Sequence, residues 1–268
     1  MDPTHGRAHA PRRWQARARA LVEAALRAFC GEARALLFPQ GCLACDAPAA
    51  AAWPSGLCGG CGAALPWRPI GSAPAEAPLE VGRRRFAAVV VALRYQPPVD
   101  ELVLRLKYGG LAVAARPLAQ ALAAAVERAE QQAQQAIAAG AGEGASFARP
   151  DLLVPIPMHP WKRLVRGGDH ADELVEELSA CLGRPVERLL KRRRATVAQG
   201  GARSLRERIE QVHRAFAVRA GGAARARGRH IGLVDDVVTS GATAAAAAFA
   251  LHRAGAATVS LLAVAGNG

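Results

Sequence analysis

Four cysteines and two adjacent aspartates are the residues of this chain whose types and spacing could do chemistry. The cysteines form two CxxC pairs, Cys42-Leu-Ala-Cys45 and Cys58-Gly-Gly-Cys61, which twelve residues separate. The aspartates, Asp235 and Asp236, follow an apolar run and precede the turn Thr239-Ser-Gly-Ala-Thr243. The cysteines predict a metal site, and the segment that contains the aspartates predicts a site for a phosphorylated sugar.

Each CxxC pair has the spacing that lets two thiolates converge on one ion, and two such pairs complete a tetrahedral site. Gly59 and Gly60 suit the tight backbone turn that this geometry imposes. Because no fifth ligand candidate lies nearby, we expect a structural Zn²⁺ ion and not a catalytic one. Two redox-active dithiols and a [4Fe–4S] cluster are the alternatives. The predicted zinc ligands are Cys42, Cys45, Cys58 and Cys61.

The aspartate pair lies where ligands bind in open parallel sheets, at the C-terminal end of a strand predicted over His230–Val234. The helix that begins after the turn offers unpaired N–H groups and a positive dipole to an anion, and the hydroxyl groups of the turn add donors. Two carboxylates suit the vicinal hydroxyls of a ribose. We therefore expect a ribose 5-phosphate site, against the alternative of a plain strand–helix turn with solvent-facing aspartates.

An alternation of strands and helices must position these residues. The apolar patterns predict helices over 102–107, 111–130, 169–182 and 241–254, and strands over 86–93, 151–157, 186–190, 215–218, 230–234 and 258–264. This order predicts an α/β fold with a mostly parallel sheet flanked by helices. The chain divides into a basic N-terminal helix (1–37), the cysteine module (38–70), a linker rich in Pro and Ala (71–82) and the α/β domain (83–268).

Positive charge is concentrated in two segments of a chain whose net charge is +13. Residues 186–229 hold thirteen Lys and Arg against three acidic residues, and residues 1–34 hold seven Arg against three acidic residues. A polyanionic partner, either a phosphorylated metabolite or nucleic acid, would explain this concentration. A solvated face rich in arginine is the alternative.

Composition and hydropathy exclude several classes of protein. With 51% hydrophobic and 21% charged residues, the chain is neither collagen-like nor fully disordered. The longest uncharged stretches, such as Gly241–Leu251, fall well below the ~20 apolar residues of a membrane span. Arginines interrupt the N-terminus where a signal peptide would need a continuous apolar core. We expect a soluble, cytoplasmic protein without a transmembrane segment.

Val234–Thr243 resembles the phosphoribosyl pyrophosphate (PRPP) motif of type I phosphoribosyltransferases. The wider pattern resembles the ComF (competence protein F, amidophosphoribosyltransferase-like) family over nearly all of residues 36–265. The matching segments are Leu36–Cys45, the second cysteine pair, Leu106–Gly110, Val154–Pro157, Arg166-Gly167, Thr196–Gln199, Arg208 and Ala215-Phe216. The chain departs from the family at Gly168-Asp169-His170, where an aromatic residue, Asn and Gln are usual.

The resemblance implies a type I phosphoribosyltransferase-like fold and assigns roles within it. The aspartates would hold the ribose hydroxyls, the turn after them would hold the 5′-phosphate, and a Mg²⁺ ion would bridge the pyrophosphate and the ribose. The implied PRPP-binding residues are Asp235, Asp236, Val237, Val238, Thr239, Ser240, Gly241, Ala242 and Thr243. The implied residues of the pyrophosphate loop and the closing loop are Pro155, Ile156, Pro157, Arg166, Arg194, Gln199 and Arg208.

The resemblance also implies a function in DNA uptake during natural transformation. The chain would bind PRPP, contact single-stranded DNA through its basic segments and work with the DNA-uptake machinery. The alternative is an active transferase that moves ribose 5-phosphate from PRPP to a nitrogen nucleophile and releases pyrophosphate, although no residue stands out as a catalytic base. A zinc-ribbon nucleic-acid protein with a vestigial PRPP pocket is the third hypothesis.

Overall fold

The computed structural model describes residues 41–48, 56–69, 86–108, 112–140, 147–158, 170–193 and 215–267. The predicted N-terminal helix and the predicted linker lie outside these residues. So do four of the residues assigned to the pyrophosphate and closing loops, which are Arg166, Arg194, Gln199 and Arg208.

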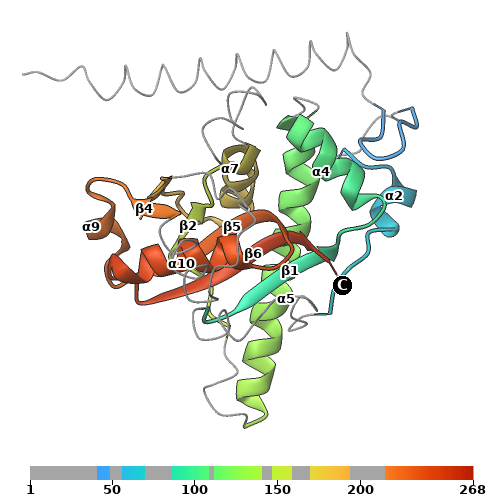
Figure 1. Cartoon of the computed structure of the whole chain (residues 1–268). Helices are drawn as coiled ribbons and strands as arrows, with labels where there is room; N and C mark the ends of the chain where they lie inside the picture. The colour runs from blue at the N-terminus through green and yellow to red at the C-terminus, as the bar shows by residue number, and fades with distance from the viewer. Residues whose placement is uncertain are drawn as a thin grey trace, which may run out of the picture.

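A four-stranded sheet forms the centre of the molecule, with the strand order β1-β6-β5-β2 (Figure 1). All three neighbouring pairs of strands run parallel. The central strand β6 is buried along all but its first residue, which is the pattern of a parallel sheet covered on both faces. The strands are β1 (Val89–Arg94), β2 (Leu152–Pro155), β5 (His230–Val238) and β6 (Thr258–Gly266). The predicted α/β fold with a mostly parallel sheet is confirmed.

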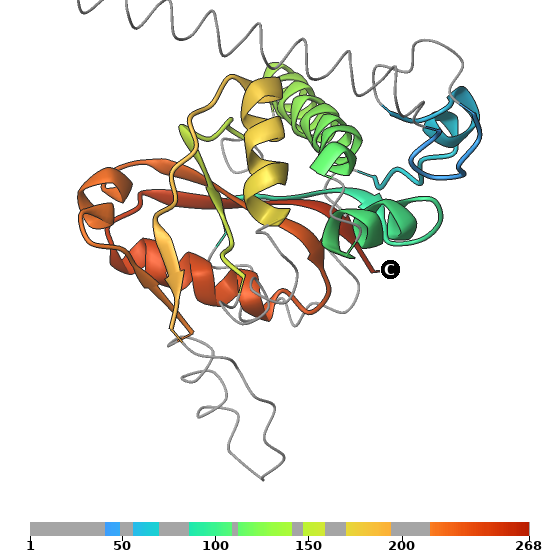
Figure 2. The ribbon, with the colours of Figure 1, turned by 90° about the horizontal axis from the view of Figure 1, so that it is seen from above.

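Helices cover both faces of this sheet and complete three layers (Figure 2). On one face lie α5 (Ala115–Ala138) and α7 (His170–Leu182), and on the other lies α10 (Ala242–Arg253). A 3₁₀ turn over Ala112–Ala114 precedes α5, and the short helix α9 (Gly222–Ala226) leads into β5. None of the described helices is long and apolar enough to span a membrane.

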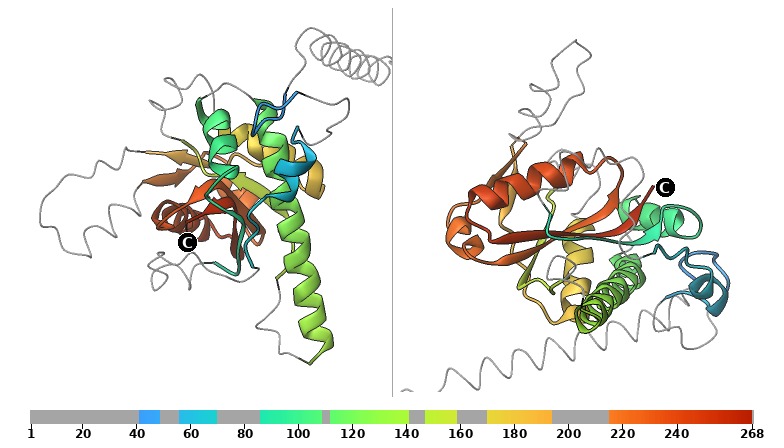
Figure 3. Two further views of the ribbon diagram at one scale, coloured as in Figure 1. Left: turned by 90° about the vertical axis from the view of Figure 1, so that its right-hand side faces the viewer. Right: turned by 90° about the horizontal axis from the view of Figure 1, so that it is seen from below.

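A small antiparallel hairpin, β3 (Leu190–Arg192) and β4 (Phe216–Val218), projects from the sheet on the side of α10 (Figure 3). The strand predicted over 186–190 is therefore largely wrong. Val186 forms a single parallel bridge to Leu153 on the edge of β2. The N–H of Leu189 then donates to the carbonyl of Glu187 (2.9 Å), and this tight turn takes the chain away from the sheet before β3 begins.

The cysteine-containing segment packs against the same sheet. It includes the short helix α2 (Gly59–Ala63) and ends in an extended stretch that pairs with β1. The N–H of Arg68 donates to the carbonyl of Ala92 (2.9 Å), and the N–H of Arg94 donates to the carbonyl of Pro66 (2.8 Å). Leu43 and Leu57 are buried in one apolar cluster with residues of the helix α4 (Val99–Tyr108). This segment is thereby fixed to β1 and α4.

Candidate functional site

The four predicted metal ligands converge in the structure. All four sulfur atoms lie within 4.8 Å of one another, and those of Cys45 and Cys58 are 3.9 Å apart. Sulfurs around a tetrahedral zinc ion with Zn–S bonds of ~2.3 Å would be about 3.8 Å apart. The four cysteines can therefore hold a metal ion.

Backbone N–H groups support the sulfur atoms of this cluster. The N–H groups of Cys58 and Ala44 point at the sulfur of Cys42, at 3.3 and 3.5 Å. Burial raises the pKa of the Cys42 thiol, but these hydrogen bonds outweigh it and lower the pKa to about 6. The sulfur of Cys58 accepts the N–H of Cys61 (3.3 Å) and so caps α2. At Cys42 the local fold thus favours the thiolate form that binds metals, whereas burial and the neighbouring sulfurs raise the pKa of the Cys61 thiol.

The two aspartates lie inside β5, because this strand continues four residues past its predicted end. It pairs with β6 as far as Val238, which is opposite Gly266. Successive side chains of a strand face opposite sides of the sheet, so Asp235 points toward the face covered by α10 and Asp236 toward the face covered by α5. A ligand that contacts both carboxylates therefore has to straddle the carboxyl edge of β5.

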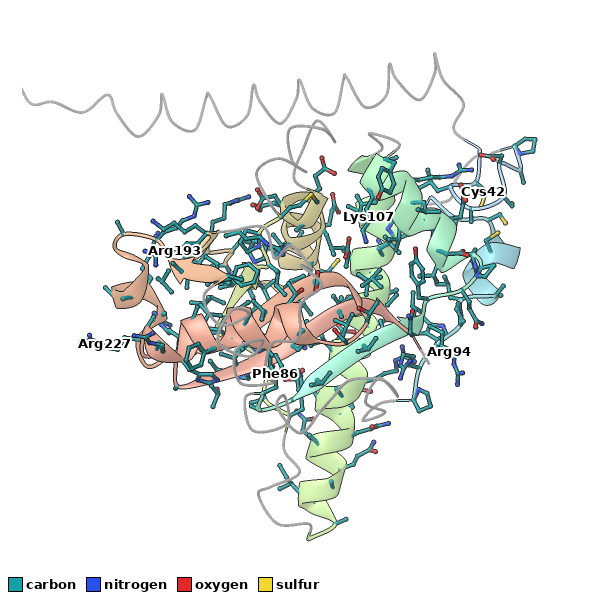
Figure 4. The ribbon with its side chains drawn as sticks, in the orientation of Figure 1. Cys42, Phe86, Arg94, Lys107, Arg193 and Arg227 are labelled. Carbon is teal, nitrogen blue, oxygen red and sulfur yellow. The ribbon has the colours of Figure 1, made fainter. Side chains whose placement is uncertain are left out.

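Asp236 pairs with a residue to which the sequence analysis gave no role. The ammonium of Lys107, near the C-terminus of α4, is 2.9 Å from Asp236 Oδ2, and each of the two side chains is 20% exposed. Figure 4 shows Lys107 on the side of the molecule that carries Cys42. The available signal was its place in Leu106–Gly110, one of the segments that resemble the ComF family.

The two carboxyl groups have different electrostatic environments. Burial, and then the neighbouring Asp236, raise the pKa of Asp235 to about 8. The N–H of Asp236, the ammonium of Lys107 and the guanidinium of Arg192 act in the opposite direction without offsetting this. The site thus combines a carboxyl that is paired with a cation and a carboxyl that holds its proton near neutral pH.

The predicted pyrophosphate loop begins beside this pair. Pro155, the last residue of β2, is opposite Val234, and the N–H of Ile156 donates to the carbonyl of Val234 (3.0 Å). Pro155 and Ile156 are buried, and Pro157 is half-buried. Parallel pairing of β2 with β5 therefore places the start of the predicted loop next to Asp235.

The turn predicted for the phosphate connects β5 to α10. Val237 and Val238 still belong to β5, whereas the side chains of Thr239, Ser240 and Thr243 are exposed. Gly241, and not a threonine, is the N-cap of α10, with a positive φ of 69°. Ala242 and Thr243, the first residues of α10, are exposed together with these hydroxyls, and the N–H of Ala242 points at Ser240 Oγ (3.5 Å). An anion site at a helix N-terminus requires such exposure.

The segment predicted to close over the substrate, around Lys191–Arg208, is described only over Lys191–Arg193. The ends of the described chain on either side of its remaining part are Arg193 and Ala215. The N–H of Arg193 donates to the carbonyl of Ala215 (2.7 Å), so the hairpin holds these ends together. The preceding residue, Arg192, acts on the charge of Asp235. Gly168 and Asp169, at which the chain departs from the ComF pattern, lie outside the described residues.

Comparison with known proteins decides the family. No model of a protein family matches the chain. Competence protein F of Haemophilus influenzae is 29% identical over 156 residues, which cover 58% of this chain and 62% of that protein. DNA utilization protein YhgH of Salmonella typhimurium is 32% identical over 206 residues, which cover 76% of this chain and 81% of that protein. The chain belongs to the competence protein F and YhgH family.

The family membership confirms the resemblance found in the sequence. The chain nevertheless spans less than two thirds of the length of competence protein F. The solved structures that the chain resembles include an allosteric regulatory enzyme of purine biosynthesis (TM-score 0.30) and the glutamine PRPP amidotransferase of B. subtilis (TM-score 0.32). Each is 18% identical, and the overlap covers 54% of this chain and 26% of the other. These overlaps are too partial to indicate the function of this chain.

Proposed function

We propose that this chain binds PRPP with Mg²⁺ at the carboxyl edge of its sheet and serves DNA uptake or utilization in the cytoplasm. One observation supports the proposed PRPP site most directly. The strand β5 places two carboxylates directly before an exposed turn of hydroxyls at a helix N-terminus, and β2 ends beside them. This is the order of groups that a ribose 5-phosphate with a pyrophosphate substituent needs.

Each part of the ligand then has a matching group. The turn Thr239–Thr243 binds the 5′-phosphate through hydroxyls and N–H groups. Asp235 and Asp236 bind the ribose hydroxyls, and Pro155–Pro157 faces the pyrophosphate. Mg²⁺ prefers oxygen ligands and keeps several waters, so it would bridge the ligand and the carboxylates and offset their charge. Lys107 is close enough to exchange Asp236 for an anionic group of the ligand.

Calorimetric titration with Mg²⁺–PRPP tests this site. We expect binding to the wild-type chain and no measurable binding when Asp235→Asn and Asp236→Asn are combined. The matched control is Asp151→Asn, because Asp151 lies at the opposite edge of the sheet, where its carboxylate accepts the N–H of His230 (2.9 Å). Unchanged affinity in the double variant would refute the site. Release of pyrophosphate with added bases or amines would identify the chain as an active transferase.

The role in DNA uptake rests on the relatives and on a basic end of the molecule. Several exposed arginines lie around the hairpin, α9 and the C-terminus of α10, and none takes part in an ion pair among the described residues. They are Arg193, Arg227, Arg229 and Arg253. Figure 4 shows Arg193 and Arg227 at the end of the molecule opposite Cys42. We propose that single-stranded DNA binds here through its phosphates, in concert with the uptake machinery.

Fluorescence anisotropy with a labelled thymidine oligomer at several salt concentrations tests DNA binding. We expect the affinity to fall as salt rises, and Arg227→Gln to reduce the slope of log affinity against log salt by about 1. Arg116→Gln is the control, since it removes one exposed charge from α5 on the other face of the sheet. Salt-independent binding, or equal effects of the two variants, would contradict the proposal.

We further propose that the ion in the cysteine cluster is a structural Zn²⁺. All four ligand positions are cysteines, which closes the coordination sphere and suits zinc. Elemental analysis of the purified chain should find about one zinc per chain. Absence of zinc, or the presence of iron and inorganic sulfide, would overturn this assignment.

A further inference from the structure

One helix contacts both sites of this molecule. Near the C-terminus of α4, Arg105 reaches the cysteine cluster and Lys107 reaches the aspartate pair. The guanidinium of Arg105 donates from Nη1 and Nη2 to the two carboxylate oxygens of Asp46, each at 2.8 Å. Two residues along the helix, Lys107 lies 2.9 Å from Asp236.

The position of Asp46 depends on the fold of the first cysteine pair. Asp46 directly follows Cys45 and has a positive φ of 55°. Its N–H donates to the carbonyl of Cys42 (2.9 Å), and the N–H of Cys42 donates to the carbonyl of Ala47 (2.7 Å). These bonds form the turn that brings the sulfurs together, and metal binding stabilises such turns. The turn that brings the sulfurs together therefore also fixes the position of the carboxylate with which Arg105 pairs.

The contact between Asp46 and α4 is geometrically specific. Two parallel hydrogen bonds fix both the distance and the plane of the guanidinium. Arg105 Nε also donates to Glu101 (2.9 Å), one turn earlier on the same helix. Asp46 is well exposed, so this pair contributes little to stability and acts chiefly by fixing position. Leu43 and Leu57 pack in one apolar cluster with Leu102 and Leu106, which adds a second connection to α4.

The contact between α4 and Asp236 is sensitive to such positioning. Lys107 and Asp236 are both largely buried, so their attraction is screened less than that of an exposed pair. A hydrogen bond of 2.9 Å is lost when its atoms separate by about 1 Å. A small shift of α4 would therefore leave the two carboxylates of β5 without their nearest cation and would misplace the groups that meet the sugar phosphate.

We propose that α4 couples the two sites, so that the metal in the cysteine cluster raises the affinity of the aspartate pair for its ligand, with Arg105 as the positioning residue. The ligand is Mg²⁺–PRPP, and in this respect the inference rests on the proposed function. Coupling between binding sites is reciprocal, so Mg²⁺–PRPP must tighten the binding of the metal by the same factor.

The test measures the Kd of the full-length chain for Zn²⁺ in a zinc buffer whose chelator does not bind Mg²⁺. We expect saturating Mg²⁺–PRPP to lower this Kd by about 5-fold or more. Arg105→Gln should bring the factor close to one without loss of zinc, Arg105→Lys should restore part of it, and Arg116→Gln should leave it unchanged. A factor of one in a wild-type chain that binds PRPP would overturn the proposal.

A second measurement tests the coupling without PRPP. If PRPP does not bind, the proposed function is wrong, but this measurement still shows whether α4 connects the two sites. Hydrogen exchange is followed in the zinc-loaded and the zinc-stripped chain. We expect zinc removal to speed exchange at Leu106–Tyr108 and at Asp235–Val238. In Arg105→Gln, exchange at Asp235–Val238 should be equally fast in both states. Faster exchange confined to residues 41–69 would show that α4 transmits nothing.

Discussion

The cysteine cluster and the aspartate pair are both connected to α4, but they are assembled in different ways. All four sulfurs, and the N–H groups that point at them, come from residues 42–61. The aspartate site instead combines β5, the turn before α10, the end of β2 and a lysine of α4. The first site is a local structure, whereas the second exists only after the sheet has formed.

Cys42 and Asp235 differ in how their surroundings affect the ionised form of the side chain. The pKa of Cys42 is lowered to about 6 although the thiol is buried, because backbone N–H groups, those of Cys58 and Ala44 first, and the Cys45 side chain form hydrogen bonds to its sulfur. Burial beside the other sulfurs instead raises the pKa of the Cys61 thiol. The pKa of Asp235 is raised to about 8, since its carboxyl is buried next to a second carboxyl. The N–H of Asp236 also donates to the Asp235 carboxyl (3.0 Å), but this hydrogen bond does not offset the burial and the neighbouring carboxyl.

The largest effect that separates the two sites should come from Cys58→Ser. It removes one metal ligand and a neighbour of the other sulfurs, whereas the serine hydroxyl can still accept the N–H that caps α2. We expect loss of the bound metal and unfolding of residues 41–69, with the parallel sheet retained, as measured by elemental analysis and limited proteolysis. Cys181→Ser is the matched control, because Cys181 is exposed and lies outside the cluster. Full metal content in Cys58→Ser would contradict the assignment of the ligands.

The pH dependence of stability should distinguish Asp235 from an ordinary carboxyl. Its pKa is higher in the folded chain than in the unfolded chain, so between about pH 4 and pH 8 only the folded chain holds this proton. Stability relative to Asp235→Asn should therefore fall as pH rises through this window, at most by ~1.4 kcal/mol per pH unit. Chemical denaturation of both chains at pH 5 and pH 8.5 measures the difference. A constant difference would show that Asp235 ionises normally.

These contrasts explain which features could be predicted from the sequence. The cysteine ligands follow from spacing alone, and β2, β4, β6 and the helices α7 and α10 follow from local apolar patterns. The extension of β5 to Val238 could not be predicted from a local pattern, because pairing with β6, and not their own side chains, holds its last residues in the strand. As a result, the opposite orientation of Asp235 and Asp236 was missed. Lys107 was missed because only the folded sheet brings α4 to β5.

A smaller effect should follow from crowding the sheet at Gly232, three residues before Asp235. A Cβ at this position would lie 2.8 Å from Pro150 Cγ, 2.9 Å from Leu153 Cδ2 and 3.1 Å from Leu262 Cδ1. We expect Gly232→Ala to destabilise the chain by ~1–3 kcal/mol in chemical denaturation, with zinc content unchanged.

The control for this substitution lies in the cysteine module. A Cβ at Gly62 in α2 would meet nothing within 4 Å, so Gly62→Ala should be neutral or slightly stabilising. Equal stability of the Gly232→Ala chain and the wild type would mean that the side chains of Pro150, Leu153 and Leu262 can move aside, since the added Cβ would meet only side-chain atoms.

The smallest effect isolates the phosphate turn from the rest of the sheet. Gly241 has a φ of 69° and open space where a Cβ would lie, so Gly241→Ala carries only the backbone cost of a left-handed conformation, about 1 kcal/mol. Gly183, at the end of α7, has a φ of 63° and the same open space, and it lies outside both sites. Chemical denaturation should show a similar loss of stability in Gly183→Ala and Gly241→Ala. Only Gly241→Ala should weaken binding of Mg²⁺–PRPP, because only there does relaxation of the backbone turn N–H groups away from the phosphate. If both variants bind equally well, the turn does not hold the phosphate, and the ligand must be bound by the groups at the ends of β2 and β5 alone.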